Sequence, residues 1–124
     1  MKILSVLLLV AVLSMLVVPS ALAMDGMEGE CPHHHEPTIE ALHHCVHHAE
    51  EMGHITNAGV AKALHAKLDA AQAALDRGQP DVAVNNLEAF INQVEAQAGK
   101  SIDAEHAGHM IMHAEMVIAS ISQG

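Results

Sequence analysis

The sequence downstream of Thr38 is divided by glycine and proline into four short segments, and each segment has the apolar spacing of a helix. Gly53, Gly78, Pro80 and Gly99 mark the divisions. Glycine just after a helix and proline in the first turn of the next one are common stop and start signals. Apolar residues recur at steps of three and four, without the alternation typical of strands. Short connections favour antiparallel neighbours, so the sequence predicts an all-α fold, a small antiparallel four-helix bundle.

Capping residues suggest where these helices begin. Thr38 is the expected N-cap of the first helix. Thr56 is the expected N-cap of the second, because Val60 then falls where a hydrophobic staple would lie. Pro80 opens the third helix, and Ser101 is the expected cap of the fourth. The expected buried faces consist of Ile39, Leu42, Val46 and Ala49; Val60, Leu64, Leu68, Ala71 and Leu75; Ala83, Leu87, Phe90, Ile91, Val94 and Ala98; and Ile102, Ala107, Ile111, Ala114, Ile118 and Ile121.

The first 23 residues have the features of a secretory signal peptide. A lysine at the second position precedes an apolar run over 3–18, and Ala21 and Ala23 occupy the positions of a small-residue cleavage signal. An uncleaved membrane anchor is the main alternative. Cleavage would leave a periplasmic or secreted chain that no longer contacts the membrane. Residues 24–37 then form a flexible tail rich in His, Met and Cys, and residues 38–124 form the helical domain.

Three stretches of the helical region have a specific pattern. They are I-T-N-A-G-V-A-K-A-L at 55–64, A-K-L-D-A-A-Q-A-A-L-D-R-G at 66–78 and A-F-I-N-Q-V-E-A-Q-A-G-K-S-I at 89–102. These stretches resemble the FIMAH domain family, and with the flanking helices the resemblance covers residues 39–121. It implies a small all-helical accessory module of secreted bacterial or archaeal proteins, without catalytic residues. The resemblance accounts for the scaffold and leaves the histidines of the first and last helices unexplained.

Histidine is the unusual component of the composition. The chain has 12 His, and its 15 Asp and Glu far outnumber its five Lys and Arg, a balance that argues against binding to nucleic acid. After signal cleavage, four cationic side chains and fifteen carboxylates leave a formal charge of −11. Protonation of all twelve imidazoles would bring that charge to +1, so the field of the molecule should depend strongly on pH near 6.

The first histidine cluster spans the tail and the first helix. Its members are His33, His34, His35, His43, His44, His47, His48 and His54. The pairs His43 with His47 and His44 with His48 are four residues apart, which places two imidazoles on one helical face. By the helical repeat these four residues lie away from the apolar stripe and are expected to face solvent. His65, on the second helix, stands alone in the sequence.

The second cluster lies on the fourth helix. His106, His109 and His113 form a row at the border of its apolar stripe. If the first and last helices pack antiparallel, the turns with His44 and His48 lie near those with His109 and His113. A four-imidazole metal site joining these two helices is then possible.

The identity of the metal is less constrained than its ligands. Imidazole suits copper and zinc, with nickel as a further candidate. Met24, Met27 and Met110 are candidate soft ligands for a cuprous ion, although methionine also fills cores. Cys31 and Cys45 form either a disulfide, which an exported chain favours, or a pair of thiolate ligands.

These patterns lead to two functional hypotheses. The first is an exported histidine-rich metal-binding protein that buffers, sequesters or delivers copper, zinc or nickel. The alternative is a non-catalytic interaction module that docks an envelope protein through a pH-responsive surface of His and Glu. We expect no enzymatic activity, because the sequence has neither an H-E-x-x-H motif nor a nucleophile elbow and the bundle is small for a substrate cleft.

Overall fold

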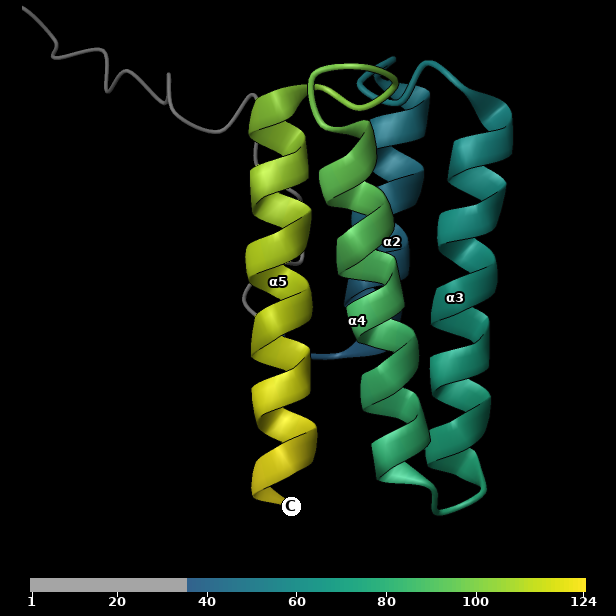
Figure 1. Cartoon of the computed structure of the whole chain (residues 1–124), viewed down its shortest axis with the longest axis vertical. Coiled ribbons are helices and arrows are strands. Elements are labelled where there is room, and N and C mark those ends of the chain that lie inside the picture. The colour runs from purple at the N-terminus through teal and green to yellow at the C-terminus, as the bar shows by residue number, and fades with distance from the viewer. Residues whose placement is uncertain (1–35) are drawn as a thin grey trace, which may run out of the picture.

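The computed structural model describes residues 36–124. The expected signal peptide and nearly all of the expected tail lie outside this range. The described residues form four helices: α2 (Ile39–Glu51), α3 (Ala58–Asp76), α4 (Pro80–Gln97) and α5 (Ala104–Gln123). Successive helices run antiparallel, with the α2–α3 and α4–α5 loops at one end of the bundle and the α3–α4 loop at the other (Figure 1). The expected all-α fold is confirmed.

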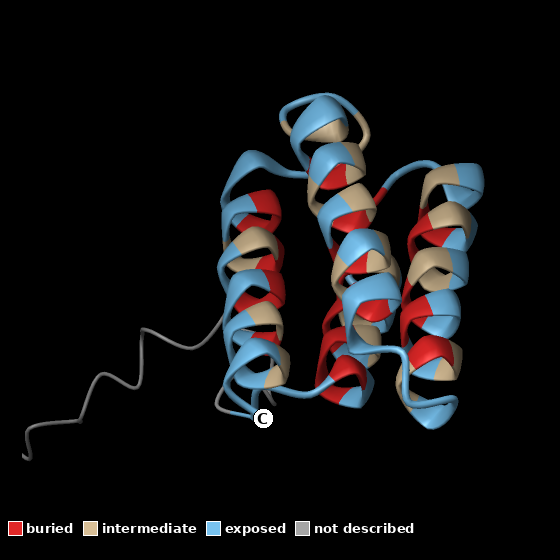
Figure 2. Ribbon diagram, turned by 60° about the horizontal axis from the view of Figure 1, so that its bottom comes forward, coloured by how far each residue is buried: buried red, intermediate tan, exposed pale blue. Residues whose placement is uncertain are grey.

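The four helices surround one core. α2 packs against α3 and α5, and α4 packs against α3 and α5, so the bundle closes on itself. Buried residues lie on the inward faces of the helices (Figure 2). The largest fully buried side chains include Phe90, Leu42, Leu64, Leu68 and Leu87. Within residues 36–124, no helix combines the length and apolarity needed to cross a membrane.

The buried face of α5 differs from the predicted one. Ile111 and Ile118 are only partly buried, whereas Met110 and His113 are fully buried and His106 nearly so. The difference arises because α5 packs against both α4 and α2. Its inward surface is therefore wider than the isoleucine stripe and includes the histidine row.

The start of α2 was predicted correctly and the start of α3 was not. Thr38 Oγ1 accepts a hydrogen bond from the Ala41 N–H at 3.1 Å, as expected of an N-cap. The cap of α3 is Asn57, whose Oδ1 accepts from the N–H groups of Gly59 (2.9 Å) and Val60 (3.2 Å). Thr56, the predicted cap, donates its hydroxyl to a loop carbonyl instead.

The start of α5 was also predicted too early. Its cap is Asp103 rather than Ser101, and Ile102 belongs to the loop. Ile55 and Ile102 are both buried and pair through an isolated antiparallel bridge. This pairing keeps both loops extended, so α3 and α5 begin only after it.

Candidate metal centre

Two loops that are distant in sequence meet at one end of the bundle and position the site. The Thr56 N–H donates to the Ser101 carbonyl at 2.9 Å, and the Asp103 N–H donates to the His54 carbonyl at 2.8 Å. Gly53, with φ of +78°, adopts the left-handed turn that carries the chain from α2 to His54. These contacts hold His54 and Asp103 beside each other.

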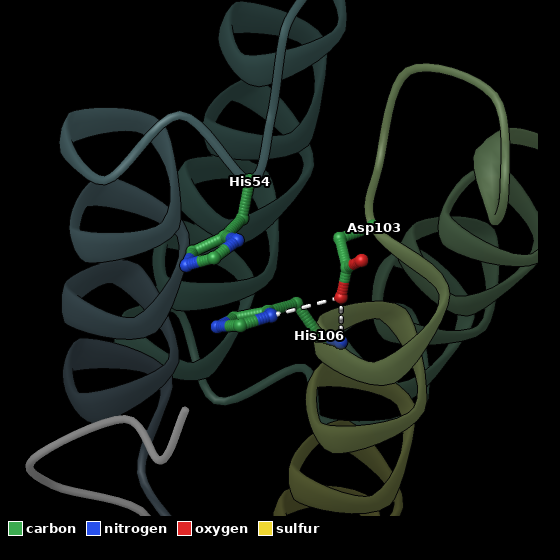
Figure 3. Close-up of side chains that lie close together, drawn as sticks. All are labelled: His54, Asp103 and His106. Atoms are coloured by element: carbon green, nitrogen blue, oxygen red, sulfur yellow. Dashed lines mark hydrogen bonds and ion pairs between the residues drawn. The ribbon is translucent and has the colours of Figure 1, made fainter. Parts of the chain in front are cut away.

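Three side chains converge there. Single ligand atoms of His54, Asp103 and His106 all lie within 4.8 Å of one another (Figure 3). The imidazoles of His54 and His106 lie face to face, with centroids 3.6 Å apart and planes inclined by 14°. His106 is 5% exposed, His54 is half-buried and Asp103 is exposed. An open hollow of about 430 Å³ borders His54 and Asp103 and gives solvent access to the loops.

Asp103 organises this group through a single oxygen. Its Oδ1 lies 3.0 Å from His106 Nδ1 and accepts hydrogen bonds from the backbone N–H groups of Glu105 and His106, both at 3.1 Å. The hydrogen bond from the His106 side chain, followed by the one from its backbone, holds the pKa of Asp103 below its ordinary value. The carboxylate is therefore both the helix cap and the acceptor for His106.

The contact with Asp103 leaves the other ring nitrogen of His106 available as a ligand atom. Because a carboxylate oxygen accepts, the neutral ring of His106 carries its proton on Nδ1 and leaves a lone pair on Nε2. Metal-bound histidines commonly donate their other N–H to a carboxylate in this way. The face-to-face rings have nearly parallel planes, so one ring must rotate before both can bind one ion. His54 lies in a loop and is half-buried, which makes it the freer of the two.

His109 lies next to this group. Its ring is 6.2 Å from that of His106, centroid to centroid. Its Nδ1 is buried and has no hydrogen-bond partner within the described part of the chain. Burying an imidazole nitrogen without a partner is unfavourable. His109 is therefore a candidate further ligand.

The predicted four-imidazole site is not assembled. In residues 36–124, the three-residue group above is the only convergence of His, Cys, Asp or Glu ligand atoms of this kind. His113 points into the interface of α2 and α5, where its Nδ1 lies 3.5 Å from Cys45 Sγ. His44 is exposed and His48 half-buried on α2. The burial of His113 separates it from the two helix-α2 histidines.

A second pair of histidines joins α2 to α3. His43 Nδ1 lies 2.8 Å from His65 Nδ1, and His43 Nε2 lies 3.2 Å from Asp69 Oδ1. The ring planes differ by 9° and the centroids are 5.0 Å apart. The separation of the centroids is close to the distance between the two Nδ1 atoms plus the radii of the two rings. The rings therefore meet end to end, with one nitrogen facing the other. Burial, and then the neighbouring His43, lower the pKa of His65.

This pair corrects two expectations. His43 packs partly against α3 instead of simply facing solvent, and His65 is not isolated. His47 does lie at the surface, as expected, and its Nε2 is 3.4 Å from Glu51 Oε1. In the sequence, His65 lies four residues before Asp69 on one face of a helix, which is the only indication that it has a polar neighbour. Its contact with His43 depends on the register of α2 against α3.

Some predicted ligands cannot be placed. Met24, Met27, Cys31, His33, His34 and His35 lie outside the described residues. The disulfide between Cys31 and Cys45 therefore stays a prediction. Cys45 itself is buried, and Met110 is fully buried in the core.

Comparison with known proteins identifies one family. A family model described as the FIMAH domain matches residues 39–119, which span the four helices almost completely. No match was found among curated proteins or among solved structures.

Proposed function

We propose that this chain, which belongs to the FIMAH domain family, is an exported metal-binding protein that buffers, sequesters or delivers a metal ion. The observation that carries the proposal is the convergence of His54 from the α2–α3 loop with Asp103 and His106 from the start of α5. The export part rests on the signal-like sequence of the first 23 residues. The proposal assigns the site a binding role and no catalysis.

The donor set narrows the choice of ion. Two imidazoles and one carboxylate suit zinc, Cu(II) and Ni(II), and the general affinity order places Cu(II) first. An ion held by His54 and His106 would tie the α2–α3 loop to the first turn of α5. If the ion binds only the folded state and its free concentration is one hundred times the Kd, binding would add about 2.7 kcal/mol to the free energy of unfolding.

The tail extends this proposal. Its Met24, Met27, Cys31, His33, His34 and His35 supply both soft and imidazole ligands directly before the bundle. In a buffering or delivery protein such a segment would capture ions and pass them to the site formed by the two loops.

Isothermal titration of residues 24–124 with Zn(II), Cu(II) and Ni(II) tests the site. We expect His54→Ala and His106→Ala each to weaken binding of at least one of these ions by about tenfold or more. The matched control is His47→Ala, which removes an exposed imidazole of the same protein. Equal affinities for the wild type, His54→Ala and His106→Ala would contradict the proposal.

A second candidate function is a protein-interaction module whose surface responds to pH. Three histidines lie within ion-pair distance of carboxylates: His43 of Asp69 (3.2 Å), His47 of Glu51 (3.4 Å) and His106 of Asp103 (3.0 Å). Protonation would strengthen these contacts and change the surface charge. Capture of an envelope protein that depends on pH and persists in chelator would favour this function over metal binding.

A further inference from the structure

The contact between α2 and α3 places two imidazole nitrogens opposite each other. His43 Nδ1 and His65 Nδ1 are 2.8 Å apart, and the two ring planes differ by 9°. Both residues are half-buried, so the pair lies at the edge of the core rather than inside it. Two facing lone pairs repel each other, so nitrogens this close share either a proton or an ion.

The carboxylate of Asp69 determines which nitrogen of His43 carries a proton. His43 Nε2 lies 3.2 Å from Asp69 Oδ1, and a carboxylate oxygen accepts. The neutral ring of His43 therefore carries its proton on Nε2 and presents the lone pair of Nδ1 to His65. Metal-bound histidines are commonly oriented by a carboxylate in this way. Asp69 thus holds His43 as Asp103 holds His106.

An open acidic hollow lies beside the pair. It has a volume of about 410 Å³, and its lining includes His43 and the carboxylates of Glu40, Asp69 and Asp76. Within the described part of the chain, no lysine or arginine lines it. Carboxylates around a hollow attract cations and raise their local concentration. The hollow therefore gives an ion a route from solvent to His43 and negative charge to offset its own.

The spacing of the two nitrogens matches that of adjacent ligands in a square-planar site. Metal–nitrogen bonds of about 2.0 Å place two ligand atoms roughly 2.8 Å apart at a right angle and roughly 3.3 Å apart at a tetrahedral angle. Square-planar coordination by N and O is typical of Cu(II) and Ni(II), and the general affinity order favours Cu(II). A hydrogen bond gives a similar spacing, so an ion can replace the shared proton once both rings tilt to direct their lone pairs at it.

We propose that the Nδ1 atoms of His43 and His65 bind a Cu(II) ion at a second site, separate from the candidate centre at the two loops. Asp69 orients His43, and water in the hollow fills the remaining positions. Binding breaks the N–H bond at His65 Nδ1 and forms one at its Nε2 by exchange with solvent, while two nitrogen–copper bonds form without a change of oxidation state. The inference deepens the proposed function and rests on it for the class of ligand, a metal ion.

The structure distinguishes this site from the histidine pair that spacing alone suggests. His47 lies four residues after His43, but its Nε2 is 3.4 Å from Glu51 Oε1 and its side chain is 61% exposed. The nitrogen of His43 that does not contact Asp69 faces His65 instead. His47→Gln is therefore the matched control for substitutions in the pair.

The test is NMR spectroscopy of isotope-labelled residues 24–124 titrated with Cu(II), whose unpaired electron broadens the signals of nearby nuclei. We expect broadening of the backbone signals of residues 62–69 in the wild type and in His54→Ala. His43→Gln and His65→Gln should each remove this broadening, and His47→Gln should retain it. Asp69→Asn keeps an acceptor for His43 but loses the charge, so it should raise the Cu(II) concentration needed by about tenfold.

Circular dichroism of each variant separates loss of binding from loss of fold. The side chain of Asp69 is 75% exposed, so Asp69→Asn supplies a folded variant even if His65→Gln disturbs the helices. Wild-type Cu(II) affinity at residues 62–69 in folded His65→Gln or Asp69→Asn would overturn the inference. An equal loss in His47→Gln would also overturn it, because the ion would then lie on α2 alone.

Failure of this inference and failure of the proposed function give different results. Broadening confined to the loops around His54 and His106 would reject the second site and leave the proposed function standing. Unchanged affinities in His54→Ala and His106→Ala, with broadening of residues 62–69 that depends on His65, would reject the loop centre and keep the second site.

Discussion

His106 combines two roles that depend on the same contacts. Its imidazole stacks on His54 and is 3.0 Å from the Asp103 carboxylate, so it helps to join the two loops. The same hydrogen bond leaves Nε2 available to an ion. The carboxylate of Asp103 therefore both holds His106 in place and leaves its Nε2 available to an ion.

Asp103→Asn separates these roles. The asparagine oxygen can still cap α5, because asparagine is as good an N-cap as aspartate. The substitution removes the negative charge that orients and polarises His106. We expect helicity by circular dichroism to be retained and Zn(II) affinity, measured by calorimetry, to fall about tenfold to hundredfold. Wild-type affinity in a folded Asp103→Asn protein would show that this carboxylate does not support the site.

His65 should make stability depend on pH. Its pKa is lowered in the folded protein by burial and by His43, so the unfolded chain binds this proton more readily. At pH values above 6.5, the ordinary pKa of histidine, His65 does not reduce the stability of the fold. Stability is lost as the pH falls through 6.5 toward the lower pKa of His65 in the folded protein. Urea unfolding between about pH 7 and pH 5 should therefore show a smaller loss of stability for His65→Gln than for the wild type.

The control for this measurement is His47→Gln, which alters an exposed histidine of α2. Equal losses of stability on acidification in His65→Gln and in the wild type would contradict the role given to His65.

At the scale of the helix, the ends of α3 and α5 are set by contacts between loops rather than by local sequence. Asn57 caps α3, while the Thr56 hydroxyl contacts the Ser101 carbonyl at 3.3 Å. The backbone of Asn57 is itself extended, with φ of −117° and ψ of 110°, so the first helical residue is Ala58 and the cap is Asn57 rather than Thr56.

Asn57→Ala tests this assignment. Loss of the cap should cost about 1 kcal/mol of unfolding free energy, measured by urea denaturation. Thr56→Ala is the matched control and should cost less, because its hydrogen bond is long and exposed. A larger loss for Thr56→Ala than for Asn57→Ala would restore Thr56 as the cap.

The number of helices and their stops could be predicted from sequence because those signals are local. Thr38 and Pro80 act on their own turns, and Gly53 adopts a conformation that other residues avoid. The pairing of His54 with His106 could not be predicted, because it requires the contact of Ile55 with Ile102 across two loops. The burial of His106 and His113 depends on how α5 rotates to meet α2, which the isoleucine stripe does not reveal.

The whole bundle depends on a core with a single aromatic side chain. Phe90 is fully buried in the core cluster of α4 and its neighbours. Phe90→Ala should lower the unfolding free energy by about 3–5 kcal/mol, a large part of the stability of a small domain. Urea denaturation of residues 24–124 checks this value, and a loss below about 1 kcal/mol would mean that the core refills around the missing ring.

Metal and fold should also be coupled at this scale, since the candidate centre joins the loops that close one end of the bundle. The most direct test is a crystal structure of zinc-loaded residues 24–124 with anomalous scattering at the zinc edge. We expect an anomalous peak about 2.0–2.1 Å from nitrogens of His54 and His106, with Asp103 bound to the ion or hydrogen-bonded to the His106 ring. Zinc bound only at other histidines, with His54 and His106 still stacked, would contradict it.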